Sequence, residues 1–233
     1  MTDDSENRQP PDAELLLRQL HGEDQHLRSI SVFKLRQFPH LTFPEITRFF
    51  ELAVKDTVAV RDVARVAIEN MGAAAVPFLL GQCHANDAAC RGQAIQLLAQ
   101  VGHCGGEPHK FATQFLGQRN DLPPDWGDYA ETVLHTVAGA LADADFAVRF
   151  AAASLLEDCN HLVEQTMPIF IEALSEGTSW QKNWAALRLG RLGPIARPAC
   201  KSLADFAADP ADAQDVWDKY AHQAARVALD RIG

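Results

Sequence analysis

The amino-acid sequence predicts an all-α protein, a right-handed α-solenoid of about six helix–turn–helix repeats with a period of about 30–33 residues. Three observations lead to this prediction. Residues of the same type recur at fixed distances before a series of glycine, asparagine or proline residues that are expected to end helices. Alanine is frequent while aromatic residues make up only 8% of the 233 residues, which favours closely packed helices. No Val-, Ile- or Thr-rich run alternates apolar with polar residues, so we expect no strands.

The repeats end at residues that stop a helix. Four of them end in an apolar residue followed by glycine, which is typical of a left-handed residue after a helix. A fifth ends in asparagine, which tolerates the same conformation, and the first ends in a proline, which cannot continue a helix. In chain order these terminators are Pro39, Gly72, Gly102, Asn160, Gly193 and Gly233.

The second helix of each repeat has one apolar face. Four residues before the terminator stand Leu35, Ile68, Leu98, Leu156, Leu189 and Leu229. Eight before it stand the small residues Ser31, Ala64, Ala94, Ala152, Ala185 and Ala225. Twelve before it stand Leu27, Val60, Cys90, Val148, Gln181 and Ala221. Because residues three or four apart share a helix face, these positions predict a buried stripe with a small residue where two helices cross.

A first helix is predicted before each second helix, separated from it by a short polar turn. The expected repeats are 12–39, 43–72, 74–102, 129–160, 166–193 and 195–233, all in a single domain that spans 11–233. Residues 1–10 are predicted to be a disordered lead-in. Residues 103–128 are predicted to be an insertion between the third and fourth repeats, with a short helix at Lys110–Leu116.

Two segments carry a resemblance to a known family. Asp56–Gly72 (DTVAVRDVARVAIENMG) and Asp145–Asp158 (DFAVRFAAASLLED) each contain an acidic turn, then Val-Arg, then alanines and leucines. The chain thereby resembles the HEAT-repeat family, specifically the bacterial HEAT-like repeats of the phycobilisome-lyase type. The resemblance covers most of residues 12–233 and implies a fold much more than a function.

Charge and cysteine content limit the classes of function. The formal net charge is -10, whereas a protein that binds duplex DNA needs a basic surface. The five cysteines are an odd number with no CxxC pair, so we expect a reduced, cytoplasmic protein. The first twelve residues lack the apolar stretch of a signal peptide, and no apolar run is long enough for a membrane helix.

A basic column stands eleven residues before the terminators. Its members are Arg28, Arg61, Arg91, Arg149, Lys182 and His222. One interpretation is anion binding. The family resemblance implies a structural role instead, in which Arg28, Arg61, Arg91, Arg149 and Lys182 form a ladder by bonding to turn oxygens and to carboxylates such as Asp56. We favour the ladder.

The fifth and sixth repeats carry the residues that we consider for protein binding. Trp180, Trp184, Arg188 and Arg191 are spaced by three or four residues, and Trp and Arg are enriched where proteins bind each other. The alternative is that the tryptophans pack against the neighbouring repeat and the arginines extend past them. Trp217 and Tyr220 in the sixth repeat, and Trp126 in the insertion, complete this predicted site.

Motifs for chemistry are missing. The sequence contains no HExxH, GxSxG, P-loop or GxGxxG motif, and we predict no catalytic residue and no cofactor. Cys83, His84, Cys90, His103, Cys104 and His109 match no standard zinc spacing, and we predict no metal site. The main hypothesis is a non-catalytic scaffold that binds a protein or an extended peptide in the groove of the solenoid. The alternatives are a bilin- or tetrapyrrole-handling enzyme or its chaperone, implied by the resemblance alone, and, more weakly, a nucleic-acid-binding protein.

Overall fold

The computed structural model describes residues 11–35, 43–101, 126–212 and 214–233. In these ranges the chain forms α-helices and short 3-10 helices and no strand, which confirms the predicted all-α solenoid class. The residue contacts divide the chain into two compact units, whereas the sequence predicts one domain. The first unit is Met1–Gly106 with Pro124–Val133, and the second is Glu107–Pro123 with Leu134–Gly233.

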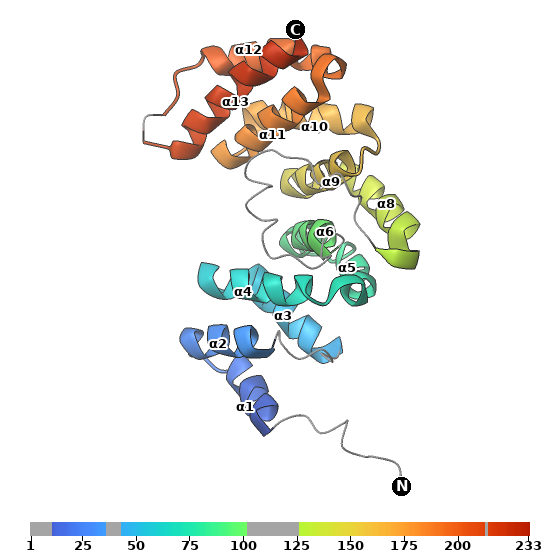
Figure 1. The fold of residues 1–233 in the computed structure, drawn as a ribbon, viewed down its shortest axis with the longest axis vertical. Coiled ribbons are helices and arrows are strands. Elements are labelled where there is room, and N and C mark those ends of the chain that lie inside the picture. Colours follow the sequence, from blue (N-terminus) through green and yellow to red (C-terminus); the bar gives the residue numbers. More distant parts are fainter. Residues whose placement is uncertain (1–10, 36–42, 102–125, 213) are drawn as a thin grey trace. The chain divides into compact units, whose positions relative to one another are not determined.

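Helices follow one another in pairs along the chain (Figure 1). The helices of the first unit are α1 (Pro11–Leu20), α2 (Gln25–Leu35), α3 (Phe43–Lys55), α4 (Val58–Glu69), α5 (Val76–Gln82) and α6 (Ala88–Val101). The division between the units falls within α8 (Ala130–Gly139). The second unit continues with α9 (Phe146–Asp158), α10 (Val163–Glu176), α11 (Ser179–Leu192), α12 (Cys200–Ala208) and α13 (Val216–Ile232). The 3-10 helices are Gly72–Ala75, Gly127–Tyr129, Ala140–Ala142 and Gly193–Ala199.

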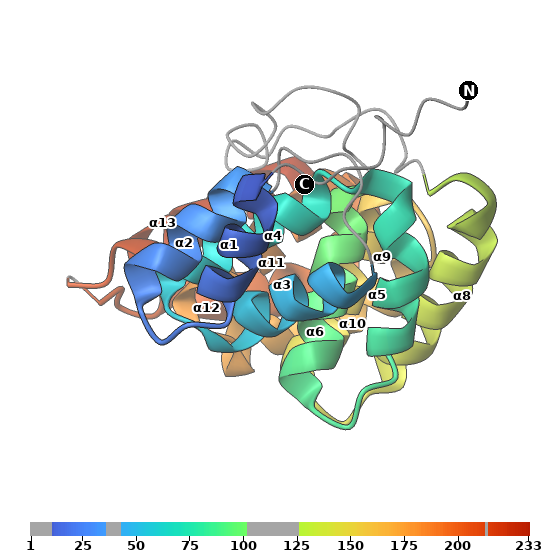
Figure 2. The ribbon, with the colours of Figure 1, turned by 90° about the horizontal axis from the view of Figure 1, so that it is seen from below.

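The two helices of a repeat pack against each other, as in α1 with α2, α3 with α4, α10 with α11 and α12 with α13. Second helices of successive repeats also pack side by side: α2 lies against α4 in the first unit, and α11 against α13 in the second (Figures 1 and 2). This is the stacking that a repeat protein requires, because one helix pair alone leaves an apolar face uncovered.

The predicted terminators have the backbone conformation that their sequence suggests. Gly72 and Gly193 each have φ of 55°, Gly233 has 75°, and Asn160 has 53°. All four φ values are positive, which glycine and asparagine adopt more readily than other residues, although ψ of -135° places Gly193 outside the left-handed helical region. Pro39 and Gly102 lie outside the described residues, as does the predicted helix Lys110–Leu116.

The small-residue column forms the centre of the helix stack. All six of its members, Ser31, Ala64, Ala94, Ala152, Ala185 and Ala225, have 0% of their surface exposed. The Leu/Ile column is buried as well, except for Leu229, which is half-buried. The outer column agrees less well, because Leu27 is exposed and Cys90 and Gln181 are half-buried.

Side-chain caps explain why the second helices begin where they do. The Asp145 carboxylate accepts hydrogen bonds from the backbone N–H groups of Ala147 and Val148, at 2.8 and 3.2 Å. Thr178 and Gln181 form a reciprocal capping box at the start of α11. Such caps satisfy N–H groups that have no partner within the helix. The helix α10 begins at Val163, before the predicted start of the fifth repeat at residue 166, so Pro168 lies inside the helix.

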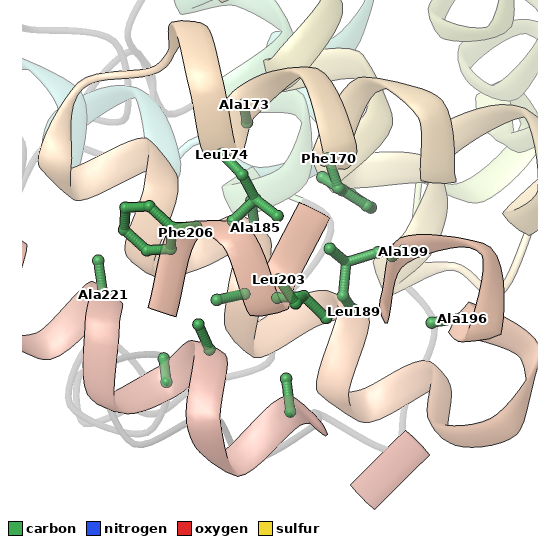
Figure 3. Packing of buried hydrophobic residues seen from close by; sticks show 14 of the residues in the cluster. Phe170, Ala173, Leu174, Ala185, Leu189, Ala196, Ala199, Leu203, Phe206 and Ala221 are labelled. Atoms are coloured by element: carbon green, nitrogen blue, oxygen red, sulfur yellow. The ribbon is translucent and has the colours of Figure 1, made fainter. Parts of the chain in front are cut away.

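One apolar core fills the second unit and includes side chains from α9 to α13. Figure 3 shows Phe206 of α12 in this core beside Leu174 of α10 and Ala221 of α13. Among the described residues no single helix is long and apolar enough to cross a membrane. By length and composition alone, α4 together with the segment Gly72–Gln82, bent from it by 109°, meets that test.

Candidate functional site

Three arginines of the basic column make the same pair of hydrogen bonds. Nη1 of Arg149 donates to the carbonyl oxygens of Asp143 and Ala144, at 2.9 and 3.0 Å. These acceptors are six and five residues earlier in the chain, in the turn before the helix. Arg28 and Arg91 bond to the carbonyls at the same two relative positions, Arg28 at 3.0 and 2.6 Å and Arg91 at 2.9 and 3.0 Å. Each arginine therefore holds the turn of its own repeat closed.

Two of these arginines also reach the next repeat. Nε and Nη2 of Arg28 donate to the two carboxylate oxygens of Asp56, at 2.7 and 2.9 Å. This paired bond lowers the pKa of Asp56, against a smaller opposing effect of burial. Arg149 pairs with Glu172 of α10 at 2.5 Å. These side chains are engaged within the protein, in the pattern of an inter-repeat ladder.

The remaining members of the column behave differently. Among the described residues, Arg61 makes no side-chain bond of this kind. The Lys182 ammonium lies 5.5 Å from the centre of the Phe206 ring, and the His222 ring stacks on the same Phe206 ring, with 4.3 Å between the two centroids. In the last two repeats the basic column thus contacts an aromatic ring of α12 and not a turn.

Arg188, which we considered for protein binding, is a buried structural residue. Only 7% of its surface is exposed. Its guanidinium donates to the Ser154 carbonyl at 3.0 Å, to both carboxylate oxygens of Asp158 at 2.9 and 3.0 Å, and to Glu157. Arg191 donates to the same two carboxylates. A buried charge is stable only when it is paired in this way, so neither arginine is free to bind a partner protein.

The carboxylates of this network were not singled out in the sequence. Glu157 and Asp158 close α9, while Arg188 and Arg191 belong to α11 about 30 residues later. Burial alone would raise the pKa of Asp158, but the charges of Arg188 and Arg191 and their hydrogen bonds outweigh that effect and lower it. The signal was the Glu-Asp pair at the end of one repeat and the two arginines at the end of the next.

The tryptophans of α11 pack partly against the preceding repeat. The Trp180 ring lies edge-on to Phe150 of α9 at 6.2 Å and lies 5.9 Å from Trp184. The Arg188 guanidinium covers Trp184 at 5.7 Å, and Nε1 of Trp184 is buried without a partner. Trp184 therefore contributes mainly to packing. Trp180 differs, because 40% of its surface remains exposed.

Trp126 is also a packing residue and offers no surface to a partner. It is 2% exposed, and its Nε1 donates to the carbonyl oxygen of Leu98 in α6 at 2.8 Å. Trp126 is therefore not available for the binding site that we predicted from the sequence, because its ring and its N–H are both covered within the first unit.

The exposed aromatic residues of α11 and α13 lie at one end of these two neighbouring helices. The side chain of Ser179, the first residue of α11, lies against the Asp215 carboxylate that caps α13, and this interaction lowers the pKa of Asp215. Farther along, a Cβ on Gly190 would come within 3.0 Å of the Ala228 Cα. The first contact joins the N-terminal ends of α11 and α13, and the second joins residues near their C-terminal ends. The two helices therefore run parallel. Their first turns therefore lie side by side.

We call the exposed side chains at these first turns the aromatic edge: Trp180, Val216, Trp217 and Tyr220. Tyr220 is 53% exposed, Val216 is 57% exposed, and Trp217 is half-buried. The Trp217 and Tyr220 rings meet edge to face at 6.1 Å. Val216 is an addition to the site predicted from the sequence.

The aromatic edge is not required by the repeat architecture. Trp180 and Tyr220 both stand thirteen residues before their terminators. The residues at that position in the second, third and fourth repeats are Ala59, Ala89 and Ala147, and all three are exposed. Alanine therefore suffices for the fold at this position, whereas the last two repeats carry a large aromatic side chain in contact with water.

The chain segment that leads into α13 and the aromatic edge is acidic. The segment from α12 to the start of α13 carries Asp209, Asp212, Asp215 and Asp218, with Lys219 as its one basic residue. Among the described residues, no Lys or Arg forms an ion pair with these four carboxylates, although Nε2 of His222 lies 3.5 Å from Asp218. The surface beside the aromatic rings is consequently negative.

A groove in the first unit is a weaker candidate. It has a volume of about 480 Å³ and is lined in part by Arg28, Arg48, Glu51 and Asp56. Its arginines are already engaged, because Arg28 pairs with Asp56, and Arg48 pairs with Glu51 at 2.9 Å. Both arginines of the groove are thus already neutralised by carboxylates and are not available for an anionic ligand.

Metal ligands do not cluster in the part of the chain that the structure describes, where no group of three or more His, Cys, Asp or Glu side chains could hold an ion. Burial raises the pKa of the Cys83 thiol to about 12, which disfavours the thiolate that zinc requires. His103, Cys104 and His109 lie outside the described residues.

The fold and these contacts define an all-α helical repeat protein. No protein-family model and no curated protein sequence matches the chain. Among solved structures, an engineered protein is 15% identical, covers 96% of this chain and 97% of its own, and has a TM-score of 0.48. A designed armadillo repeat protein is 14% identical, with coverages of 94% and 99% and a TM-score of 0.45. The complex of CpcE and CpcF of phycocyanin lyase from a Nostoc species is 15% identical, with coverages of 100% and 99% and a TM-score of 0.35. These values are too low to assign a family or an activity.

Proposed function

We propose that this chain is a HEAT-like repeat protein that works as a non-catalytic adaptor and binds another protein at the aromatic edge. One observation carries the proposal: Trp180 and Tyr220 are 40% and 53% exposed at a repeat position where the second, third and fourth repeats carry alanine. Exposing a large aromatic ring is unfavourable unless a partner covers it. Trp and Tyr are also the residues that most often dominate binding energy at protein interfaces.

The support comes from the second unit alone. Its helices α11 and α13 are held by a shared apolar core, so the aromatic edge stands on a rigid base and little conformational entropy is lost on binding. The ion-pair network of Arg188 and Arg191 stabilises that base and does not itself contact the partner. The site proposed here is therefore smaller than the one that the sequence predicts.

The test compares partner capture by the wild-type protein with capture by the double variant Trp180→Ala, Tyr220→Ala. Both substitutions introduce the residue found at the same position of the second, third and fourth repeats, so the fold should be retained. Immobilised wild-type protein is expected to retain a protein from an extract of its source cells that the double variant does not retain. Circular dichroism melts of both proteins check that the variant is folded.

Ile195→Ala is the matched control. Ile195 is 60% exposed and lies beyond the other end of α11, about 20 Å from Trp180 at 1.5 Å per residue. We expect this variant to capture the same protein as the wild type. Equal capture by the wild type and the folded double variant would refute the proposed site, and equal loss in the Ile195 variant would indicate non-specific apolar adsorption.

A further inference from the structure

We infer that the segment recognised at the aromatic edge is an amphipathic, basic peptide segment whose apolar side chains cover Trp180 and Tyr220 and whose Lys or Arg side chains face the surrounding aspartates. This inference rests on the function proposed above and specifies the chemistry of the partner. It follows from three properties of the edge: its apolar rings, their spacing and the charge beside them.

The apolar part of the partner is defined by the rings. Trp180, Val216 and Tyr220 are exposed, and Trp217 supports Tyr220 from the side. Neighbouring packed helices are about 8–10 Å apart, which sets the approximate spacing between Trp180 and the exposed side chains of α13. Two side chains seven residues apart on a helix are separated by about 10 Å. An amphipathic helix with apolar residues at intervals of three, four and seven therefore matches this spacing.

The charged part of the partner is defined by the carboxylates. Asp209 and Asp212 are exposed in the segment that leads into α13, and Asp215 and Asp218 lie in or next to its first turn. No Lys or Arg of the described chain pairs with any of these four. Lys182 and Lys219 are the basic residues nearby along the chain, and Lys182 faces the Phe206 ring. Asp215 and Asp218 accept backbone hydrogen bonds, but no Lys or Arg neutralises their charge. Carboxylates in this state beside an apolar surface favour a cationic segment, because opposite charges steer the encounter and increase its specificity.

The same charge argues against other occupants. A second copy of this chain carries a net charge of -10 and would place one acidic rim against another. Nucleic acid and anionic lipid surfaces bring further negative charge to the rim, where binding requires basic residues. Of these classes of partner, a basic amphipathic peptide is the one that interacts favourably both with the apolar rings and with the carboxylates of the edge.

The experiment measures binding of three fluorescein-labelled synthetic peptides by fluorescence anisotropy. The first is a lysine–leucine amphipathic peptide with leucines at helical spacing, the second has its lysines replaced by glutamate, and the third has its leucines replaced by serine. We expect the lysine–leucine peptide to bind the wild-type protein, with a dissociation constant that increases with salt. The other two peptides should bind at least about tenfold more weakly, as expected when one of two contributing interactions is lost.

Protein variants locate the binding. Tyr220→Ala should weaken binding of the lysine–leucine peptide by about tenfold, the scale of an interface hot spot. Asp209→Asn and Asp212→Asn should each weaken it by about two- to fivefold, the scale of exposed charge pairs, and should reduce its dependence on salt. The matched control is Asp230→Asn, which removes one exposed carboxylate from α13 about 18 Å beyond Asp218 and should leave binding unchanged.

The outcomes separate this inference from the proposed function. If the lysine–leucine peptide does not bind, or if Asp230→Asn weakens it as much as Asp209→Asn does, the basic segment is refuted. The adaptor function then still stands if the wild-type protein captures a partner that the Trp180, Tyr220 double variant loses. If capture does not depend on those two residues, the proposed site fails regardless of how the peptide binds.

Discussion

Replacement of Arg188 by methionine should strongly destabilise the second unit. The change removes a buried guanidinium that bonds Ser154, Glu157 and Asp158, while methionine fills a similar volume without a charge. Removal of one partner of a buried ion pair typically costs about 3–5 kcal/mol, because the other charge stays buried. Arg191 remains bonded to both carboxylates, so we expect a loss at the lower end, about 3 kcal/mol.

For a unit of this size, about 3 kcal/mol corresponds to a decrease in Tm of roughly 10 °C or more. The assay is thermal and urea unfolding monitored by circular dichroism. The triple change Arg188→Met, Glu157→Gln, Asp158→Asn should recover part of the loss, because it removes two buried carboxylates that Arg191 alone cannot both neutralise. A decrease in Tm of less than about 2 °C for Arg188→Met alone would refute the network as a source of stability.

The same network predicts a dependence on pH. Arg188 and Arg191 hold the pKa of Asp158 below its ordinary value of 3.8. The stability from the ionised Asp158 is therefore fully present above that pH and is lost as the pH falls through the lower folded-state pKa. In acid, the wild-type protein and Arg188→Met should become more similar in Tm. If their difference in Tm stays constant from pH 7 down to pH 2, the ionic part of the argument is wrong.

Three further predictions concern packing and burial. Gly190→Ala should lower the free energy of unfolding by about 1–3 kcal/mol, because the new Cβ would lie 3.0 Å from the Cα of Ala228 in α13. In the same urea unfolding assay Gly139→Ala should be neutral or stabilising, because nothing lies within 4 Å of its Cβ. Trp126→Phe should lower the free energy of unfolding by about 1–2 kcal/mol, because the hydrogen bond to α6 is lost. Partner capture should stay intact, and a loss of capture would contradict the structural role of Trp126. Burial raises the pKa of Glu69 above its ordinary value of 4.5, so the ionised form destabilises the folded protein at neutral pH. Glu69→Gln should therefore increase Tm at neutral pH. This gain should disappear below pH 4.5, where the glutamate is protonated in both the folded and the unfolded chain. A gain that persists at pH 3 would show that the ionisation of Glu69 is not its source.

The helical architecture could be predicted because it depends on local patterns. Alanine eight residues before a glycine or asparagine with positive φ places a small side chain at a helix crossing, and Ala64, Ala152 and Ala185 are indeed fully buried. The bonds of Arg28 and Arg149 to the preceding turn are also local, since the acceptors lie within six residues.

The binding site could be predicted only in part because burial depends on residues far away in sequence. Arg188 and Trp180 share a stripe of α11, yet one is buried and the other is exposed. The difference arises from Glu157 and Asp158, which lie about 30 residues earlier and attract the guanidinium inward. Trp126 is buried for a comparable reason, because the Leu98 carbonyl that it bonds is 28 residues away.

The most direct measurement is hydroxyl-radical footprinting of the aromatic side chains, with and without the lysine–leucine peptide. Trp180 and Tyr220 should react readily in the free protein and become protected in the complex, while Trp126 should be unreactive in both states. If Trp180 and Tyr220 are unreactive in the free protein, or remain fully reactive while the peptide is bound, the aromatic edge is not the binding surface.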